Sequence, residues 1–338
     1  MRLCIIADDL TGALDAAAPF AERGLSTRVA LGAEATAEAA ALNPQVMAVS
    51  TRSRDGDEAA ARAAMAQVLA ALPPGVALMK KVDSRLKGHV AAELAVLDPS
   101  AMLVAPAIPD FGRITRDGQV RGFGVDQPIP VRDRLGDLAG RATIPDVATR
   151  DDMRAALAAA PAGALLVGAR GLAEALAIAL TGQHDAPPAR PPQGRALLVV
   201  GSRDPITLAQ VARAGGAALA AAPLGDLANA ESLAETPFLL VQATPGDTPR
   251  AGDAVARALA RSVHPHLTRG RRSLLLTGGA TAEAVLAEMG VSLLDLRGEC
   301  LPGLPLAYAG ERCIIAKSGG FGDEDTLATL LAMFRGTG

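Results

Sequence analysis

The stretch RLCIIADDLTGALDAA (residues 2–17) decides the fold class. Its first part, RLCIIA (2–7), predicts a buried strand, and the residues after it predict a helix over 11–24 that ends at Gly24. The same alternation of short apolar runs and Ala-rich helical stretches continues along the chain. Strands separated by helices of this length are typical of parallel sheets covered on both faces, so the sequence predicts an α/β fold.

A proline-rich stretch, QHDAPPARPPQG (183–194), interrupts this alternation. Proline cannot continue a helix, so the stretch predicts a linker. The pattern restarts beyond it with the apolar run RALLVV (195–200). We therefore predict two α/β domains with largely parallel sheets, over residues 1–182 and 195–338.

The charge balance excludes one class of partner. The 338 residues carry 33 Lys and Arg against 36 Asp and Glu, for a formal net charge of −3. This balance lacks the basic excess that a nucleic-acid backbone requires. One Tyr, six Phe and no Trp also leave few rings for base stacking. We expect no nucleic-acid partner, while an apolar helix expected over 57–72 is a candidate surface for a homodimer.

Membrane, secretory and cysteine signals are also lacking. The apolar runs are shorter than the roughly 20 residues that a membrane span needs. The N-terminal MRLCIIADD has carboxylates where a secretory signal would remain apolar. Cys4, Cys300 and Cys313 are spaced too widely for a metal motif or a disulfide framework. We expect a soluble, cytoplasmic protein with no membrane partner.

Lysine is scarce, and its positions are informative. Four of the 33 basic residues are lysine, and the others are arginine. Where arginine occupies most cationic positions, the remaining lysines are candidates for sites that need a compact, mobile ammonium. Three of them lie in KKVDSRLK (80–87) and the fourth, Lys317, lies in AKSGG (316–320). Chance clustering of so few residues is the alternative.

Two adjacent carboxylates follow the first predicted strand, at the sheet edge where ligands bind in α/β proteins. Asp8 and Asp9 come directly after the strand, and Thr11 and Gly12 begin the next helix. Such carboxylates suit a Mg²⁺ ligand, a hydroxyl acceptor or a general base. A helix cap accounts for one carboxylate but not for two.

A cationic loop follows the strand predicted over 76–81. This strand brings Lys81 to the sheet edge, and Asp83, Ser84 and Lys87 lie in the loop after it. Cations, a hydroxyl and helix amides around one point indicate a site for a carboxylate or a phosphate. Asp83 is expected to stay ionised among these cations and to accept a hydroxyl proton. A solvated charged loop is the alternative.

The segment STRSRD (50–55) also follows a predicted strand. It offers Arg52 or Arg54 as a bidentate clamp for a carboxylate, with an ordinary surface arginine as the alternative. The catalytic residues are therefore sought among Lys81 and three carboxylates, and the base stays open between Asp8, Asp9 and Asp83.

Three glycine-rich turns follow strands of the second domain: VVGSRDPIT (199–207), LLTGGATAEA (275–284) and AKSGGFGDEDTL (316–327). Glycine lets a phosphate approach the backbone closely. One such turn indicates only a tight connection, but three on one domain predict a nucleotide cradle. The candidate residues are Gly201, Ser202, Thr277, Gly278, Gly279, Ala280, Thr281, Lys317, Gly319 and Gly320.

Other common motifs are missing. Ala316 and Glu311 stand where a P-loop ending at Lys317 would need glycine. No G-x-G-x-x-G follows the first strand, the four histidines lack zinc-site spacing, and no G-x-S-x-G occurs. Dinucleotide binding, zinc chemistry and nucleophile-elbow hydrolysis are disfavoured.

The combined motifs resemble those of the four-carbon acid sugar kinase family, in particular its D-threonate or D-erythronate kinase branch. The segments that carry the resemblance are ADDLTG (7–12), KKVDSRLKG (80–88), APAIPDFGRITRDG (105–118), VVGSRDPIT, LTGGATA and AKSGGFGDEDTL, in this order along essentially the whole chain.

The resemblance implies a kinase that uses ATP to phosphorylate the terminal hydroxyl of a four-carbon sugar acid. The N-terminal domain would bind the acid through ADDLTG and KKVDS. The C-terminal domain would hold ATP through Ser202, the turn from Thr277 to Thr281, and Gly319–Gly320. Mg²⁺ would bridge the phosphates and keep several waters.

The chain departs from the family pattern at four places. The family usually has Asn at Leu14, Thr-Leu-Arg at residues 85–87 and Glu at Ala280, and often Ser at Asp204. The first two departures concern the choice of acid, and the last two lie on the nucleotide side.

Two other functions remain open from the residues alone. A non-catalytic sensor would bind a sugar acid or a nucleotide without turnover. A Schiff-base aldolase or isomerase would use the Lys81 amine as nucleophile and would be trapped by borohydride.

Overall fold

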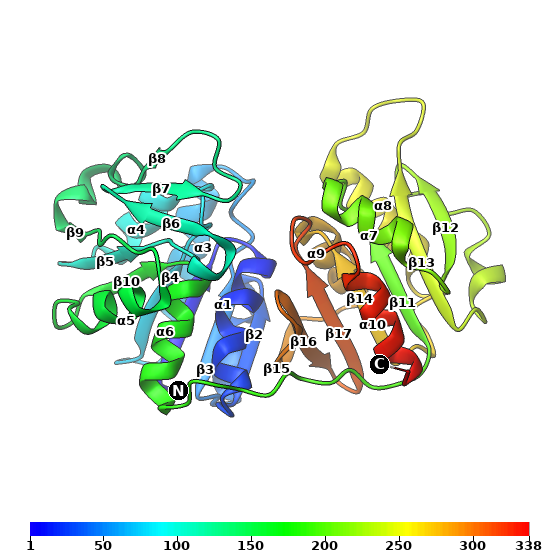
Figure 1. Cartoon of the computed structure of the whole chain (residues 1–338), viewed down its shortest axis with the longest axis horizontal. Helices are drawn as coiled ribbons and strands as arrows, with labels where there is room; N and C mark the ends of the chain where they lie inside the picture. The colour runs from blue at the N-terminus through cyan, green and yellow to red at the C-terminus, as the bar shows by residue number, and fades with distance from the viewer. Residues whose placement is uncertain (338) are drawn as a thin grey trace. The chain divides into compact units, whose positions relative to one another are not determined.

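The computed structural model describes residues 1–337, and the chain divides into two compact units, Met1–Pro187 and Pro188–Gly338. The division falls within the proline-rich stretch 183–194. Each unit has helices on both faces of a mostly parallel sheet (Figure 1). The α/β fold expected from the sequence is confirmed.

The first unit is built on seven parallel strands in the order β2-β3-β1-β4-β10-β5-β9. Its strands are β1 (Leu3–Ala7), β2 (Thr27–Leu31), β3 (Val46–Ser50), β4 (Ala77–Lys81), β5 (Met102–Ala105), β9 (Ala142–Thr143) and β10 (Leu165–Gly168). Its helices are α1 (Leu10–Glu22), α2 (Thr36–Ala41), α3 (Glu58–Ala71), α4 (Val90–Leu97), α5 (Arg150–Ala158) and α6 (Arg170–Thr181).

Strands β1 and β3 are buried at every position, because helices cover both faces of the sheet. This burial explains why their sequences are continuous apolar runs rather than alternating ones. The helix expected over 57–72 is α3, and its Ala61, Met65 and Val68 are buried.

The glycine-rich segment 112–130 contains a structure that its sequence did not suggest. Strands β6 (Arg113–Arg116), β7 (Gln119–Gly122) and β8 (Ile129–Pro130) form a small antiparallel sheet. Val120 of this sheet is buried in a core shared with α4 and β5. The segment is therefore a folded part of the first unit rather than an irregular excursion.

The second unit has the strand order β12-β13-β11-β14-β17-β16-β15. Its strands are β11 (Ala196–Val200), β12 (Ala218–Pro223), β13 (Phe238–Thr244), β14 (Ser273–Thr277), β15 (Leu293–Leu301), β16 (Leu304–Ala309) and β17 (Arg312–Lys317). Its helices are α7 (Pro205–Arg213), α8 (Gly252–Val263), α9 (Gly279–Glu288) and α10 (Thr326–Arg335).

Sequence reasoning missed three of these strands. β12, ALAAAP, is an alanine-rich edge strand whose composition also suits a helix. β15 and β16 pair antiparallel with each other, and β16 with β17, around glycine- and proline-containing turns. In residues 1–337 no helix combines the length and the apolar character that crossing a membrane requires.

Candidate functional site

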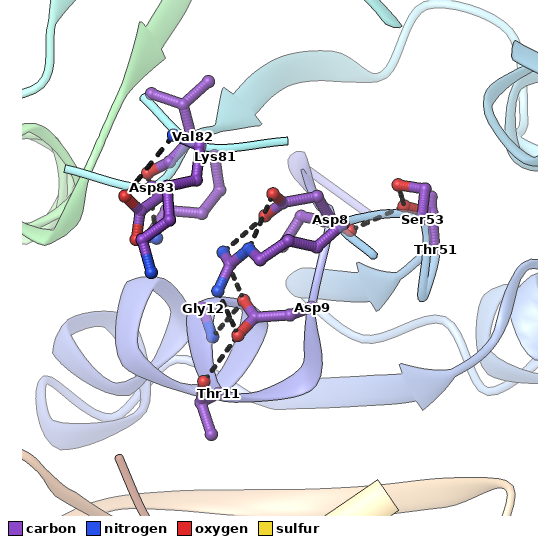
Figure 2. A network of polar contacts seen from close by, with 12 residues as sticks. Asp8, Asp9, Thr11, Gly12, Thr51, Ser53, Lys81, Val82 and Asp83 are labelled. Carbon is purple, nitrogen blue, oxygen red and sulfur yellow. Dashed lines mark hydrogen bonds and ion pairs between the residues drawn. The ribbon is translucent and has the colours of Figure 1, made fainter. Parts of the chain in front are cut away.

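Three neighbouring strands of the first unit end at one edge of its sheet, and polar residues follow each of them. In the order β3-β1-β4, β1 leads to Asp8 and Asp9, β3 leads to residues 51–54, and β4 ends at Lys81. Parallel strands present their carboxyl ends together, and ligands bind there in open α/β sheets. Figure 2 shows Asp8, Asp9, Lys81 and Asp83 gathered at this edge.

Arg54 joins the two adjacent carboxylates. It donates to the Asp8 oxygens at 2.9 and 2.7 Å and to the Asp9 oxygens at 2.6 and 2.8 Å. Asp9 also caps α1 by accepting the Gly12 amide at 2.9 Å, and it accepts the Thr11 hydroxyl at 2.6 Å (Figure 2). Arg54 thus holds Asp8 and Asp9 together, and Thr11 and Gly12 join the cluster through Asp9.

The charges around this cluster keep it ionised. Burial alone raises the pKa of Asp8, but the Arg54 hydrogen bond and the charges of Lys80, Arg54 and Lys81 outweigh it and hold the pKa below its usual value. Burial lowers the pKa of Arg54, but Asp8, Asp9 and Asp83 outweigh this effect and raise it. Asp8 and Arg54 therefore form an ion pair at neutral pH.

Lys80 belongs to the protein interior. Its Nζ pairs with a Glu93 oxygen at 3.0 Å, and the two side chains are 0% and 1% exposed. The other Glu93 oxygen accepts the Ser53 hydroxyl at 2.7 Å, and Ser53 contacts Thr51 at 2.8 Å. This buried network ties β4 to α4 and to the end of β3.

Lys81 is also buried, but its ammonium has few protein partners. Its Nζ donates to the Val82 carbonyl at 3.0 Å, and a Cβ placed on Gly12 would lie 3.1 Å from it. No carboxylate among residues 1–337 lies within ion-pair distance of Lys81. Lys81 therefore has N–H donors available for a ligand between Gly12 and Asp83.

Asp83 lies in the loop after β4, among cationic side chains. Its Oδ1 accepts the amides of Arg85 at 2.9 Å and of Lys87 at 3.5 Å. Burial alone raises the pKa of Asp83, but Arg54, Lys81, the Arg85 amide and Lys87 outweigh it and lower the pKa. At neutral pH this residue is a carboxylate beside the Lys81 ammonium.

Two contacts hold that loop in place. Ser84 is buried and accepts from Arg113, whose guanidinium also donates to the Phe123 carbonyl at 2.9 and 2.8 Å. Gly88 has a φ of +85°, and a Cβ there would lie 2.7 Å from an Asp8 oxygen. Glycine is therefore required for the loop to pack on the Asp8 cluster.

Two predicted residues, Arg52 and Lys87, do not join the cluster through their side chains. Arg52 has a φ of +54°; it donates to the Leu31 carbonyl and pairs with Glu34 at 3.4 Å. The Lys87 side chain is exposed, and its charge reaches Asp83 only at longer range. Of the two arginines in STRSRD, Arg54 is the one at the site.

The glycine-rich turns of the second unit follow three adjacent parallel strands, β11, β14 and β17. Gly278 has a φ of +98°, and a Cβ there would lie 3.4 Å from the Ser202 amide nitrogen. A Cβ on Gly319 would overlap the Ser202 hydroxyl, and one on Gly201 would overlap the Thr281 hydroxyl. The predicted turns are packed against one another. No side chain larger than hydrogen fits at Gly201 or Gly319, and the positive φ of Gly278 disfavours any other residue there.

Backbone donors are left free around these turns. Helix α9 begins at Gly279, and the amides of its first turn, including those of Ala280 and Thr281, have no acceptor within the helix. The amides of Gly319 and Gly320 also donate to no acceptor among residues 1–337. Such a group of amides matches the oxygen atoms of a phosphate.

Lys317 lies buried beneath the last turn. Its Nζ donates to Thr207 Oγ1 at 3.1 Å and to the Ser318 and Gly319 carbonyls at 3.1 and 3.0 Å. Burial lowers its pKa to about 8, and Asp204 opposes part of this shift. Its three N–H bonds are therefore directed at oxygens of the protein.

The described residues do not form a protein cage for a metal ion. In residues 1–337 no group of three or more His, Cys, Asp or Glu side chains is placed to hold one, and Asp8 and Asp9 are engaged by Arg54. Mg²⁺ often binds through substrate phosphates and water instead. The side chains present fit a cation that is held mainly by nucleotide phosphates.

Comparisons with known proteins match two domain families in this chain. Residues 3–133 match a sugar-binding N-terminal domain, and residues 227–327 match a nucleotide-binding C-terminal domain. A D-threonate kinase of Cupriavidus necator is 34% identical, with 97% of this chain and 96% of that protein covered. The chain belongs to the four-carbon acid sugar kinase family.

Other members of the four-carbon acid sugar kinase family cover the chain as fully. A D-threonate kinase of Bordetella bronchiseptica is 30% identical over 96% of this chain and 95% of its own. A 3-oxo-tetronate kinase of Methylobacterium radiotolerans is 28% identical over 98% and 99%. The family resemblance drawn from the motifs is confirmed. The expectations that the chain is a kinase and that it has a nucleotide-binding domain are confirmed as well.

Solved structures share the fold of this kinase family member. A Haemophilus influenzae protein superposes with a TM-score of 0.71 at 19% identity, covering 98% of this chain and 100% of its own. A Salmonella typhimurium protein described as a tRNA synthase gives 0.74 at 20% identity, covering 98% of each. At these identities the likeness concerns the fold alone.

Several polar residues of the two sites were not singled out in the kinase sequence. Glu93, Arg113, Thr207 and Gln210 each hold a loop at a strand end. A glutamate within the apolar helix sequence VAAELAVL was a readable signal, because a buried carboxylate needs a cationic partner. Arg113, Thr207 and Gln210 gave no comparable signal.

Proposed function

We propose that this protein transfers the terminal phosphate of ATP to the terminal hydroxyl of a four-carbon sugar acid such as threonate or erythronate. The names of the relatives support the substrate class. The observation that carries the proposal is the Lys81 ammonium, which is 4% exposed yet has one carbonyl partner. A buried cation with unused donors favours an anionic ligand.

Lys81 binds the substrate carboxylate or the migrating phosphoryl group in this proposal. Asp8 and Asp9 accept hydrogen bonds from substrate hydroxyls, and Arg54 holds both carboxylates in position. Thr11, Gly12 and Ser84 belong to the same two segments and complete the proposed acid site. These residues position the acid, and positioning with charge neutralisation is most of what phosphoryl transfer requires.

Asp83 is the base that we assign. Its low pKa keeps it ionised at neutral pH, and it lies beside Lys81 without a bidentate arginine partner. Asp8 and Asp9 each bond Arg54 through both oxygens, so they are less available to receive a proton. Asp83 orients the attacking hydroxyl and accepts its proton.

The nucleotide is held in the second unit by the glycine turns. The amides around Gly278–Thr281 and Gly319–Gly320 donate to the phosphates, and the Ser202 turn closes the cradle. When bound, Mg²⁺ neutralises charge on the β- and γ-phosphate oxygens. The buried Thr277 hydroxyl has no partner in the described chain and fits a further contact in this cradle.

The experiment that tests the proposal is a coupled ADP-release screen with four-carbon sugar acids. We expect turnover with at least one of them, dependent on ATP and Mg²⁺. Acid binding without turnover by any acid would contradict the proposal and favour a sensor. A borohydride-trapped adduct at Lys81 would instead favour a Schiff-base enzyme.

Asp83→Asn tests the assignment of the base. The change keeps the shape of the side chain but removes its charge, so we expect kcat to fall by roughly 10²–10⁴ with little change in KM. A kcat close to that of the unmodified protein would pass the role to Asp8 or Asp9.

A further inference from the structure

The turn after β17 is held from beneath by three buried side chains. Lys317 Nζ donates to the Ser318 and Gly319 carbonyls at 3.1 and 3.0 Å. The Thr207 hydroxyl donates to the same Gly319 carbonyl at 2.6 Å and accepts from Lys317 at 3.1 Å. Consecutive carbonyls of the turn therefore face α7 and the end of β17.

Gln210 extends this arrangement along the turn. Its Nε2 donates to the Phe321 carbonyl at 3.0 Å and to the Asp323 carbonyl at 2.6 Å. Thr207, Gln210 and Lys317 are each 0% exposed. None of the three side chains is at the surface, where a ligand would contact it.

The directions of these carbonyls determine where the N–H groups of the same peptide units point. In a trans peptide the N–H points opposite to the C=O of the same unit. The Ser318 and Gly319 carbonyls point inward to Lys317, so the N–H groups of Gly319 and Gly320 point outward. Within residues 1–337 these two amides have no acceptor.

We propose that Lys317, Thr207 and Gln210 form a carbonyl clamp that aims the Gly319 and Gly320 amides at a nucleotide phosphate. Lys317 is then a positioning residue, and it does not touch the phosphate although its charge and its place in the sequence suggest that it does. This inference rests on the nucleotide site of the proposed function.

ADP binding to the purified protein, measured by calorimetry, tests the clamp. Lys317→Met and Thr207→Val each remove donors without adding bulk, and each should weaken ADP binding by about tenfold. The double variant should bind ADP only slightly more weakly than the weaker-binding of the two single variants, because both changes release the same Gly319 carbonyl. Thr207→Ser keeps the hydroxyl and should retain the affinity.

Arg271→Met is the matched control. Arg271 is likewise a buried cation that donates to backbone carbonyls, those of Leu267 and Ala196, but at the amino end of β11. Its loss should lower the melting temperature and leave the ADP affinity within twofold. An equal loss of ADP affinity in Arg271→Met would overturn the clamp by showing a general effect of destabilisation.

The outcomes separate the clamp from the proposed function. Lost affinity in Lys317→Met with full affinity in Thr207→Val would make Lys317 a phosphate ligand and overturn the clamp. Because the measurement is ADP binding, it holds even if no sugar acid is turned over. A protein that binds no ADP would overturn both the clamp and the nucleotide site.

Discussion

Lys81 ends β4 in the first unit, and Lys317 ends β17 in the second. Each lysine is the last residue of its strand, both lie where parallel strands end, and both are buried, at 4% and 0% exposure. Lys81 donates to one carbonyl, whereas Lys317 donates to three oxygens. The same residue type in the same topological position thus leaves donors for a ligand in one unit and none in the other.

In the proposed function, the two sites recognise an anion in different ways. The first unit gathers charged side chains around Lys81 and Asp83, so its specificity depends on the identities of those residues. The second unit presents backbone amides between glycines, so its binding depends on backbone shape. Ala280, where the family resemblance implies Glu, is an exposed residue in the first turn of α9.

Lys80→Met should cause the largest change, and it would affect stability rather than chemistry. Removing one partner of the buried pair with Glu93 leaves an uncompensated carboxylate, at a cost of about 3–5 kcal/mol of unfolding free energy. Chemical denaturation measures this loss, and kcat of the folded fraction should stay within a few-fold. The exposed pair Arg62–Glu58 is the control, since Arg62→Met should change stability by less than about 1 kcal/mol.

Lys81→Met should show the opposite pattern to Lys80→Met. We expect a small change in the free energy of unfolding and a large fall in kcat. Loss of a charge-assisted contact in a water-excluded site typically lowers kcat by about 10²–10³. Lys81→Arg should recover little activity, because a planar guanidinium does not fit the place of an ammonium beside Gly12. If Lys81→Met kept its rate and lost stability, Lys81 would be a structural cation like Lys80.

Gly278→Val tests whether backbone approach decides nucleotide binding. A branched side chain there meets the Ser202 amide and demands a backbone that valine rarely adopts, so we expect KM for ATP to rise by at least about tenfold. Sugar-acid binding, followed by calorimetry, should stay within a few-fold. Gly290→Val is the matched control, because Gly290 also has a positive φ but no neighbour within 4 Å, and its KM for ATP should not change.

The smallest expected effect is on how the free energy of unfolding depends on pH in the acidic range. The folded pKa of Asp8 lies below its unfolded value, so its ionised form stabilises the fold above the unfolded pKa, and this stability is lost as the pH falls through the folded pKa. Denaturant unfolding measured between pH 7 and pH 2 should show this loss. Asp8→Asn should flatten that part of the profile, whereas the exposed change Glu58→Gln should leave it in place.

The family motifs and the strand ends were readable without coordinates. Strands β1 and β4 were predicted almost to the residue. β1 is a continuous buried apolar run, and β4 begins with apolar residues and ends at two buried lysines. The candidates Asp8, Asp9 and Asp83 followed from those ends. The hairpin β15–β16 and the sheet β6–β8 were not predicted, because glycine and proline interrupt their apolar patterns.

The sequence by itself determined that lysines, carboxylates and glycines stand at the ends of parallel strands, because local apolar patterns place those ends. Only the tertiary structure decided the use of each residue. It paired Lys80 with Glu93, directed Arg54 rather than Arg52 to the carboxylates, and enclosed Lys317 among carbonyls. These outcomes depend on partners from distant segments, which the neighbours of a residue along the chain do not specify.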